Sequence, residues 1–388
     1  MRISTMDTSS PRSKVDMPAV YLAGVGSFIP ENLYTNRDIC EAVGLSPRKG
    51  EKYEALLGVR SRPICVDYRA GGKQIVTGEE LALRAAYQAL HSAGITAAAL
   101  DAVICTSSFF DYVAPPLSSR LLKRLEITSA MTFDLMGGCA EFLHGIQVAA
   151  NMIRLGQADT VLITASEVIN AFWRQVRYPI EYFIFGDTGG AIVLSSRIQG
   201  SHRLISEYLS THSQIAGEPA ELICVPIIGG KEPAPLFYTN THVDRDAPVQ
   251  DEIPAHLRLV HDIKKVASGA PQAMIEATRR ILHEQSVSPD SVYLVPHQAS
   301  IGVLSALPET GVPVGQIGIS LPERGNMSTA SLPVTLCEHL EEALSTPYLV
   351  LTSVGVGMSF GATLFERVKR EEEGTRVGER VERPEIGR

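Results

Sequence analysis

One cysteine of the sequence stands where a thiol could act as a nucleophile. Cys139 lies in the segment DLMGGCAEFLHGI, after an expected buried strand and before an expected amphipathic helix. Gly137 and Gly138 permit the tight backbone turn that such a junction needs. A thiol at a helix N-terminus faces the positive end of the helix dipole, which favours the reactive thiolate. The alternative is a cysteine that only fills the core, so the segment alone leaves both roles open.

Two further side chains could act on a carbonyl oxygen or on a proton. His297 follows an expected strand in YLVPHQAS, and ligand chemistry in α/β proteins gathers at the carboxyl ends of strands. An imidazole there can serve as base, acid or hydrogen-bond donor, or can simply be satisfied by backbone. Asn326 lies in ERGNMSTASLP. It can cap a helix, or its amide can stabilise a developing enolate or carbonyl oxygen.

A glycine-rich segment near the end of the ordered chain could supply backbone donors. Gly355, Gly357 and Gly361 lie in TSVGVGMSFG, where they allow backbone amides to approach a ligand as an oxyanion hole requires. The spacing does not match a dinucleotide or phosphate-loop fingerprint, and GVG at 24–26 lacks the third glycine of one.

The elements that must position these residues alternate between strand and helix. Apolar runs such as VYLAGVG, AVICTSS, TVLITAS and YLVLTSVGVG indicate buried strands, and EELALRAAYQALHSAG and PQAMIEATRRILHEQ indicate helices between them. This alternation predicts an α/β fold. The order helix, turn, strand, glycine turn, helix, strand occurs twice, and it places Asn326 in the second copy where Cys139 stands in the first. We therefore expect two similar halves whose corresponding loops meet.

The chain divides as follows in this interpretation. Residues 1–17 are expected to be a disordered N-terminus, and residues 369–388 a charged disordered tail. Residues 18–200 form the first half and residues 201–368 the second. An insertion at about 203–260, rich in Pro, Gly and polar residues, interrupts the repeat as either a functional lid or surface decoration.

Composition excludes several classes of function. The chain has 388 residues and a formal net charge of −8 without basic runs, which argues against nucleic-acid binding. It has no apolar stretch of membrane-spanning length and no secretory signal, so we expect a soluble, cytoplasmic protein. Its six cysteines include no C-x-x-C pair, which argues against a zinc site or a disulfide framework. Five of them are expected to be structural: Cys40, Cys65, Cys105, Cys224 and Cys337.

Taken together, these segments resemble the thiolase superfamily, and most closely its 3-oxoacyl-acyl-carrier-protein synthase III group. The matching segments are GCAEF, FGDTGGAIVL, VPHQA, GNMSTASLP and GVGMSFGATL, spread over nearly the whole ordered chain. The resemblance implies a five-layered α-β-α-β-α fold built from two duplicated halves. It also implies a homodimer that uses neither a metal nor another cofactor.

The resemblance implies a role for each site residue. Cys139 accepts an acyl group from an acyl-CoA or acyl-carrier-protein thioester, and His297 and Asn326 stabilise the enolate formed when a malonyl thioester loses CO2. The backbone amides of Cys139 and Val356 form the oxyanion hole. Three further positions are expected to border the substrate: Trp173, Ser300 and Phe360.

The sequence also departs from the members of the group that start fatty-acid synthesis. Their Trp and Arg, which enclose the adenine of coenzyme A, correspond here to Lys52 or Tyr53 and to Leu56. The arginine after their HQAN motif corresponds to Gly302, and the motif itself is HQAS. These departures favour relatives from polyketide or other secondary-metabolite pathways.

Three functions remain open at this stage. The first is a decarboxylative condensing enzyme, which the complete Cys-His-Asn set favours. The second is an acyltransferase that passes the acyl group from Cys139 to a hydroxyl or amine, with His297 as base. The third is a non-catalytic partner subunit, which the presence of the cysteine disfavours. A basic docking patch for an acidic carrier protein could come from seven cations: Arg120, Lys123, Arg124, Lys264, Lys265, Arg279 and Arg280.

Overall fold

The computed structural model describes residues 17–368, except residues 71, 113, 172–178, 199, 213, 216–217, 220–222, 225–259 and 262. Residues 1–16 and the expected tail at 369–388 lie outside the described residues, as does most of the expected insertion. Residues 203–211 of that expected insertion belong to a regular strand of the main sheet.

Nine strands form one mixed sheet in the order β15-β16-β17-β10-β1-β9-β8-β6-β7. In chain order their bounds are β1 Tyr21–Phe28, β6 Ala102–Thr106, β7 Met131–Leu135, β8 Thr160–Glu167, β9 Thr188–Ser195, β10 His202–Thr211, β15 Val292–Pro296, β16 Tyr348–Val354 and β17 Ser359–Arg367. β8 has the sequence TVLITASE and is buried along its whole length, as a strand covered on both faces should be.

The two parts of the sheet have the same pairing pattern. In β6-β8-β9-β1 the first pair is parallel and the next two are antiparallel, and β15-β16-β17-β10 repeats this. An isolated parallel bridge between Leu294 and Ile317 stands beside β15 where β7 stands beside β6. The parts join through β1 and β10, at Tyr21 with Arg203 and Leu22 with His202. This is the fold of two duplicated halves expected from the sequence, whereas the boundary at 200 stays a prediction.

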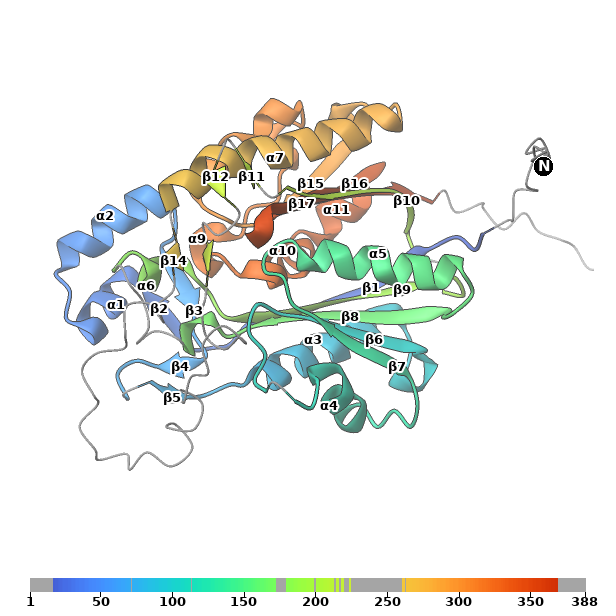
Figure 1. Cartoon of the computed structure of the whole chain (residues 1–388), viewed down its shortest axis with the longest axis horizontal. Coiled ribbons are helices and arrows are strands. Elements are labelled where there is room, and N and C mark those ends of the chain that lie inside the picture. The colour runs from blue at the N-terminus through green and yellow to red at the C-terminus, as the bar shows by residue number, and fades with distance from the viewer. Residues whose placement is uncertain are drawn as a thin grey trace, which may run out of the picture.

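Helices cover both outer faces and fill the space between the two parts of the sheet (Figure 1). α5 (Glu141–Arg154) and α10 (Ser331–Glu338) lie in the middle layer, and each contacts strands of both parts. α3 (Gly78–Ala93) and α4 (Leu117–Arg124) cover one outer face, and α7 (Ile263–Glu284) covers the other. The result is the five-layered α-β-α-β-α arrangement.

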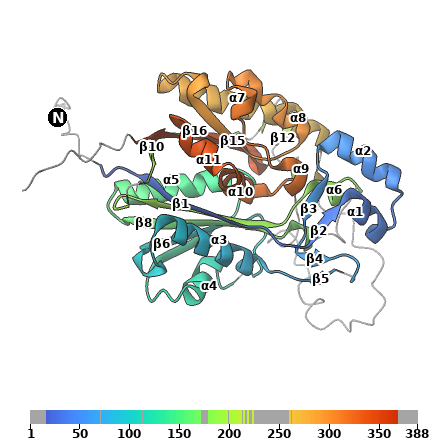
Figure 2. The ribbon, with the colours of Figure 1, turned by 180° about the vertical axis from the view of Figure 1, so that it is seen from behind.

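Smaller elements gather at one end of the molecule, as both views show (Figure 2). They include α1 (Asn36–Val43), α2 (Pro47–Leu57), β2 (Leu33–Thr35), β3 (Ser61–Pro63), β4 (Val66–Asp67), β5 (Lys73–Gln74) and α6 (Glu181–Ile184). The remaining short helices are α8 (Ile301–Leu304), α9 (Leu321–Arg324) and α11 (Leu340–Ser345). The remaining short strands are β11 (Gln214–Ile215), β12 (Glu218–Pro219), β13 (Ile223–Cys224) and β14 (Val260–His261).

The GVG segment of β1 serves helix packing. A Cβ atom on Gly24 would lie 2.2 Å from the carbonyl oxygen of Ala89, and one on Gly26 would lie 2.4 Å from that of Ala85. Both carbonyls belong to α3, so the glycines let this helix lie directly against the strand.

Candidate active site

Cys139 lies in the turn between β7 and α5. Gly138 adopts a left-handed conformation with φ of 88°, which favours glycine, and α5 begins at Glu141. The Cys139 carbonyl oxygen accepts a hydrogen bond of 2.8 Å from the hydroxyl of Ser353, at the end of β16. The second half of the chain therefore holds the backbone of the candidate nucleophile in place.

Ser328 links the candidate residues of the two halves. Its Oγ lies 3.5 Å from Cys139 Sγ, and its backbone N–H donates to Asn326 Oδ1 at 2.9 Å. Asn326 Nδ2 makes only a long contact of 3.4 Å, to the Ala299 carbonyl oxygen. Ser328 has φ of 46°, an uncommon value for a residue with a side chain. The contact of this serine with Cys139 was not predicted from the sequence.

The backbone of Asn326 is fixed on both sides. Its N–H donates to the carbonyl oxygen of Ile184 at 2.7 Å, and its own carbonyl accepts from Gly186 N–H at 3.0 Å. These bonds join the asparagine turn to the segment FGDTGG that leads into β9. A Cβ on Gly186 would lie 1.9 Å from the Arg324 carbonyl oxygen, so this close approach requires glycine.

His297 follows β15 directly and is 2% exposed. Its backbone N–H donates to the Thr352 carbonyl oxygen at 2.8 Å. Burial lowers the pKa of the imidazole to about 3, against an opposing contact with the Ser328 backbone. The side chain is therefore neutral at physiological pH and carries one N–H donor and one acceptor.

The glycine-rich segment before β17 lies against the Cys139 turn. A Cβ on Gly355 would lie 2.6 Å from Ala140 N and 3.0 Å from Cys139 N. A Cβ on Gly138 would lie 3.7 Å from Val356 N. Among the described residues, neither the Cys139 N–H nor the Val356 N–H donates to a backbone carbonyl of a turn or loop. The two amides of the expected oxyanion hole thus lie on segments that contact each other, and their role stays a prediction.

Burial opposes ionisation of the Cys139 thiol. It raises the pKa to about 11, the charge of Glu167 adds to the rise, and the Ser328 hydroxyl opposes it. The position at the start of α5 led us to expect a favoured thiolate. In the folded protein the loss of water outweighs that effect, and the thiol of the free site keeps its proton.

A buried acid near Cys139 was not identified from the sequence. Glu167 is the last residue of β8, and its side chain is fully buried. One carboxyl oxygen accepts from Ser108 N at 2.9 Å, from Ser108 Oγ at 3.0 Å and from Thr329 N at 3.3 Å. Burial raises the pKa of Glu167 to about 8. The only sequence signal is a charged residue that ends an apolar strand.

The three expected substrate positions have separate outcomes. Trp173 lies outside the described residues. Phe360 is buried in β17, with its ring 4.8 Å from the ring of His212. Ser300 precedes α8 and is half-buried. Their contact with the substrate stays a prediction.

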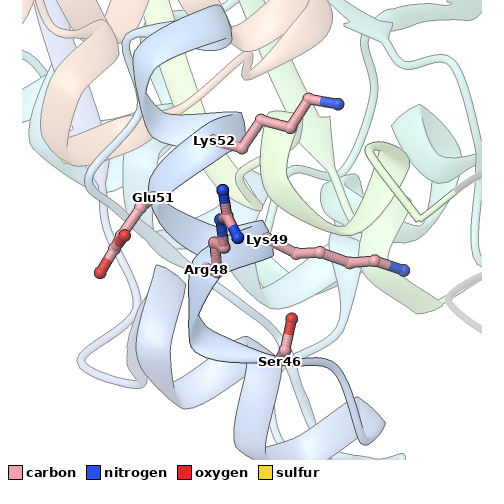
Figure 3. Close-up of a pocket in the computed structure, with 5 residues that line it drawn as sticks. All are labelled: Ser46, Arg48, Lys49, Glu51 and Lys52. Atoms are coloured by element: carbon pink, nitrogen blue, oxygen red, sulfur yellow. The ribbon is translucent and has the colours of Figure 1, made fainter.

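A cationic depression of about 610 Å³ lies along α2 (Figure 3). Lys49 and Lys52 extend to the same side of the helix, while Glu51 extends to the other. Ser46 and Arg48 complete the lining. This is the region that carries the Trp and Arg of the group that the sequence resembles, and here it offers ammonium groups.

Most of the described cations expected to form a docking patch have partners. Arg120 and Arg124 form ion pairs with Glu79, and Arg124 also pairs with Glu80. Arg280 pairs with Glu284. Arg279 donates to the Glu309 carbonyl oxygen. The side chains of Lys264 and Lys265 lie outside the described residues.

Comparison with known proteins agrees with the fold and with the order of these segments. Residues 133–213 match the model of 3-oxoacyl-[acyl-carrier-protein] synthase III, and residues 282–367 match the model of its C-terminal part. β-Ketoacyl-[acyl-carrier-protein] synthase III of Pseudomonas aeruginosa is 28% identical over 352 residues, which cover 89% of this chain and 95% of that protein. The corresponding enzyme of Symbiobacterium thermophilum is 27% identical over 350 residues, covering 88% and 96%.

Solved structures have the same architecture. That of 3-oxoacyl-(acyl carrier protein) synthase III from Pseudomonas aeruginosa superposes with a TM-score of 0.71 at 25% identity, covering 90% of this chain and 98% of that one. A priming β-ketosynthase from a polyketide biosynthetic pathway superposes with a TM-score of 0.73 at 23% identity, covering 91% and 97%. With the duplicated five-layered fold and a match in each half, the chain is similar in sequence and in fold to the 3-oxoacyl-acyl-carrier-protein synthase III proteins of the thiolase superfamily.

Proposed function

We propose that this condensing, acyl-transferring enzyme loads an acyl group on Cys139 and extends it with a malonyl thioester, in polyketide or other secondary-metabolite biosynthesis. The donor is an acyl-CoA or an acyl-carrier-protein thioester. One observation carries the proposal. Ser328 touches the thiol of Cys139 and also binds the amide of Asn326, so the nucleophile and the carbonyl-binding group share one site.

In the first step the Cys139 sulfur attacks the thioester carbonyl. The thiol gives up its proton as the new sulfur–carbon bond forms and the carbonyl electrons move to oxygen. The carbonyl then re-forms, the bond to the donor sulfur breaks, and the donor leaves as a thiol with the proton that Cys139 lost. The backbone N–H groups of Cys139 and Val356 stabilise the oxyanion, since donors already placed beside the developing charge need no rearrangement.

In the second step the malonyl thioester loses CO2. The bond to the carboxylate breaks and its electrons form an enolate, whose oxygen accepts from His297 and Asn326. The low pKa of His297, about 3, supports this role because a neutral imidazole and a neutral amide can both donate. The enolate carbon then attacks the acyl carbonyl, and Cys139 leaves as a thiolate.

The alternative is transfer of the acyl group to a hydroxyl or amine without condensation. The group's adenine-binding Trp corresponds here to Lys52 or Tyr53 and its Arg to Leu56, which supports this alternative, and Leu56 is 55% exposed. Asn326 favours condensation, because simple transfer produces no enolate for this amide to hold. A non-catalytic partner subunit is disfavoured by the free thiol of Cys139 in the site.

We also propose a homodimer that forms through β7. This strand lies at one edge of the sheet, and Met131 at its start and Met136 just after its end are 51% and 67% exposed. An uncovered edge with apolar side chains can pair with another strand, and a second copy of β7 is the simplest partner. The change Met136→Glu should produce monomers, measured by sedimentation velocity.

Other features are compatible with a cytoplasmic location. Five cysteines are free thiols: Cys40, Cys65, Cys105, Cys139 and Cys337. Within the described ranges, no helix is both long and apolar enough to cross a bilayer.

The testing experiment is intact-protein mass spectrometry after incubation with a panel of acyl-CoA and acyl-carrier-protein thioesters. We expect a mass gain in the wild type and in Cys337→Ala, which removes another partly exposed thiol, but none in Cys139→Ala. Added malonyl-carrier protein should then release CO2 and a 3-oxoacyl product. Acylation without CO2 release, but with loss of the acyl group to an alcohol or amine, would select the alternative.

A further inference from the structure

A chain of buried hydroxyl groups connects the nucleophile to Glu167. Cys139 Sγ lies 3.5 Å from Ser328 Oγ, which lies 2.7 Å from Ser108 Oγ, which in turn lies 3.0 Å from Glu167 Oε1. Ser328 is 2% exposed and Glu167 is fully buried. The steps proposed above make no use of this carboxyl group.

The surroundings of Glu167 favour its neutral form. Oε1 lies within hydrogen-bond distance of two backbone N–H groups and one hydroxyl, which favour the carboxylate, but burial outweighs them, and Oε2 is buried without a partner among the described residues. Across the same part of the chain, no cationic side chain hydrogen-bonds with this carboxyl group. A carboxylate buried without a cation is costly, whereas the protonated acid is not.

Other titratable groups lie on the elements around Glu167. Cys139 precedes α5, and His297 contacts the Ser328 backbone. Asp187 precedes β9, but its oxygens accept from Cys65 and Asn170. Among these groups, the hydroxyl chain reaches Cys139 alone.

We propose that Glu167 is a positioning residue that works in its protonated form. It holds the Ser108 and Ser328 hydroxyls against Cys139 Sγ, and loss of its proton turns the nucleophile off. A hydroxyl has one proton to donate, so Ser328 donates to a Cys139 thiolate only while Ser108 donates to Ser328 and protonated Glu167 donates to Ser108. An ionised Glu167 instead accepts from Ser108, which then takes the proton of Ser328 away from the sulfur. The inference rests on the proposed function only in taking Cys139 as the nucleophile.

The pKa values agree with this arrangement. The charge of Glu167 raises the pKa of Cys139, so the ionised acid opposes the thiolate. Glu167 itself has a pKa of about 8 against about 11 for the thiol, so the acid loses its proton first as the pH rises. The fraction of sites able to form an active thiolate should therefore stop growing near pH 8 rather than near pH 11.

The test is the rate of Cys139 alkylation by iodoacetamide between pH 6 and pH 10, followed by intact-protein mass spectrometry. Cys139→Ala subtracts the reaction of the other thiols. In the wild type we expect the rate to level off near pH 8. Glu167→Gln has the same shape and keeps an acceptor for Ser108 and Thr329, and its rate should continue to rise.

The size of the difference in alkylation rate between the wild type and Glu167→Gln follows from the titration of Glu167. With a pKa of about 8, about a tenth of the sites keep the Glu167 proton at pH 9. Glu167→Gln should then be alkylated about tenfold faster than the wild type at pH 9, and equally fast at pH 6. A purely structural role would instead change the rate by the same factor at every pH.

Two further variants keep the inference testable if Glu167→Gln does not fold. The Ser108 hydroxyl lowers the pKa of Glu167, so Ser108→Ala should move the plateau to higher pH. Asp187→Asn removes a buried carboxyl outside the hydroxyl chain and should leave the plateau near pH 8.

A wild-type rate that rises without a plateau to pH 10 would overturn the inference, as would parallel profiles for the wild type and Glu167→Gln. Failure of the proposed function is distinguishable. In that case no thioester acylates Cys139, while the alkylation profile still reports on Glu167.

Discussion

Gln298 holds together the two segments that carry His297 and Asn326, and its replacement by alanine should be among the most costly single changes outside the reacting residues. Its Nε2 donates to the Pro296 carbonyl oxygen at 2.8 Å and to that of Gly318 at 3.2 Å. Its Oε1 accepts from Ser320 N at 2.9 Å and Leu321 N at 3.0 Å. The side chain is 0% exposed, so water does not compete for these four bonds.

The expected loss of stability follows from the number of hydrogen bonds that Gln298 makes. A buried hydrogen bond contributes about 1 kcal/mol net, and each buried group left unpaired costs about 1–3 kcal/mol. Gln298→Ala removes all four bonds. Because a water molecule can enter the space and restore some of them, we expect the free energy of unfolding to fall by about 3–5 kcal/mol rather than by the full sum.

The assay is urea unfolding followed by circular dichroism, with the midpoints compared at a common slope. Gln74→Ala is the control, because Gln74 is exposed and its one side-chain bond goes to Val76 O. Gln298→Glu keeps an oxygen that accepts the two backbone N–H groups. It replaces the Nε2 donor by a second carboxyl oxygen, which then faces the two carbonyl oxygens that Nε2 had bound. That carboxyl should have a raised pKa, so its stability is highest at low pH and falls as the pH rises through that pKa. A loss below about 1 kcal/mol in Gln298→Ala would refute the reasoning.

Three further predictions concern the surroundings of the nucleophile. Gly355→Ala places a Cβ 2.6 Å from Ala140 N, so it should displace the start of α5, cost about 1–3 kcal/mol in urea unfolding and abolish acylation by mass spectrometry. Ser353→Ala removes the 2.8 Å bond to the Cys139 carbonyl and should lower the free energy of unfolding by about 1 kcal/mol. Burial raises the pKa of Glu167 from 4.5 to about 8, so its contribution to stability is fully present below pH 4.5 and is lost as the pH rises to about 8. Urea midpoints between pH 5 and pH 8 should therefore fall less steeply in Glu167→Gln than in the wild type.

The positions of the candidate residues along the chain could be predicted because they depend on local pattern. The glycine turn before Cys139 and the apolar strand before His297 are both visible in a few neighbouring residues. The internal repeat also predicted that Cys139 and Asn326 occupy equivalent positions in the two halves, and both do precede a helix of the middle layer. The role predicted for Val356 came only through the resemblance and stays a prediction, because a backbone amide carries no sequence signal of its own.

The remaining features depend on contacts between distant segments. Ser328 meets Cys139 across 189 positions of sequence, and no local pattern marks such a contact. Gln298 was seen only as part of a motif, since its four partners become visible only when the loops are folded together. The direction of the Cys139 pKa shift was expected wrongly from the helix position, because the cost of burial is a property of the whole fold.

The duplicated fold explains why Ser328 can contact both Cys139 and Asn326. Two similar halves place their equivalent turns at the starts of α5 and α10, and both helices lie in the middle layer. Cys139 occupies one turn, while Asn326 and Ser328 occupy the other, so the turns face each other across the joint between the halves. Neither turn holds both a nucleophile and an amide donor. Chemistry that needs a thiol and a carbonyl-binding group together therefore depends on the packing of the two halves.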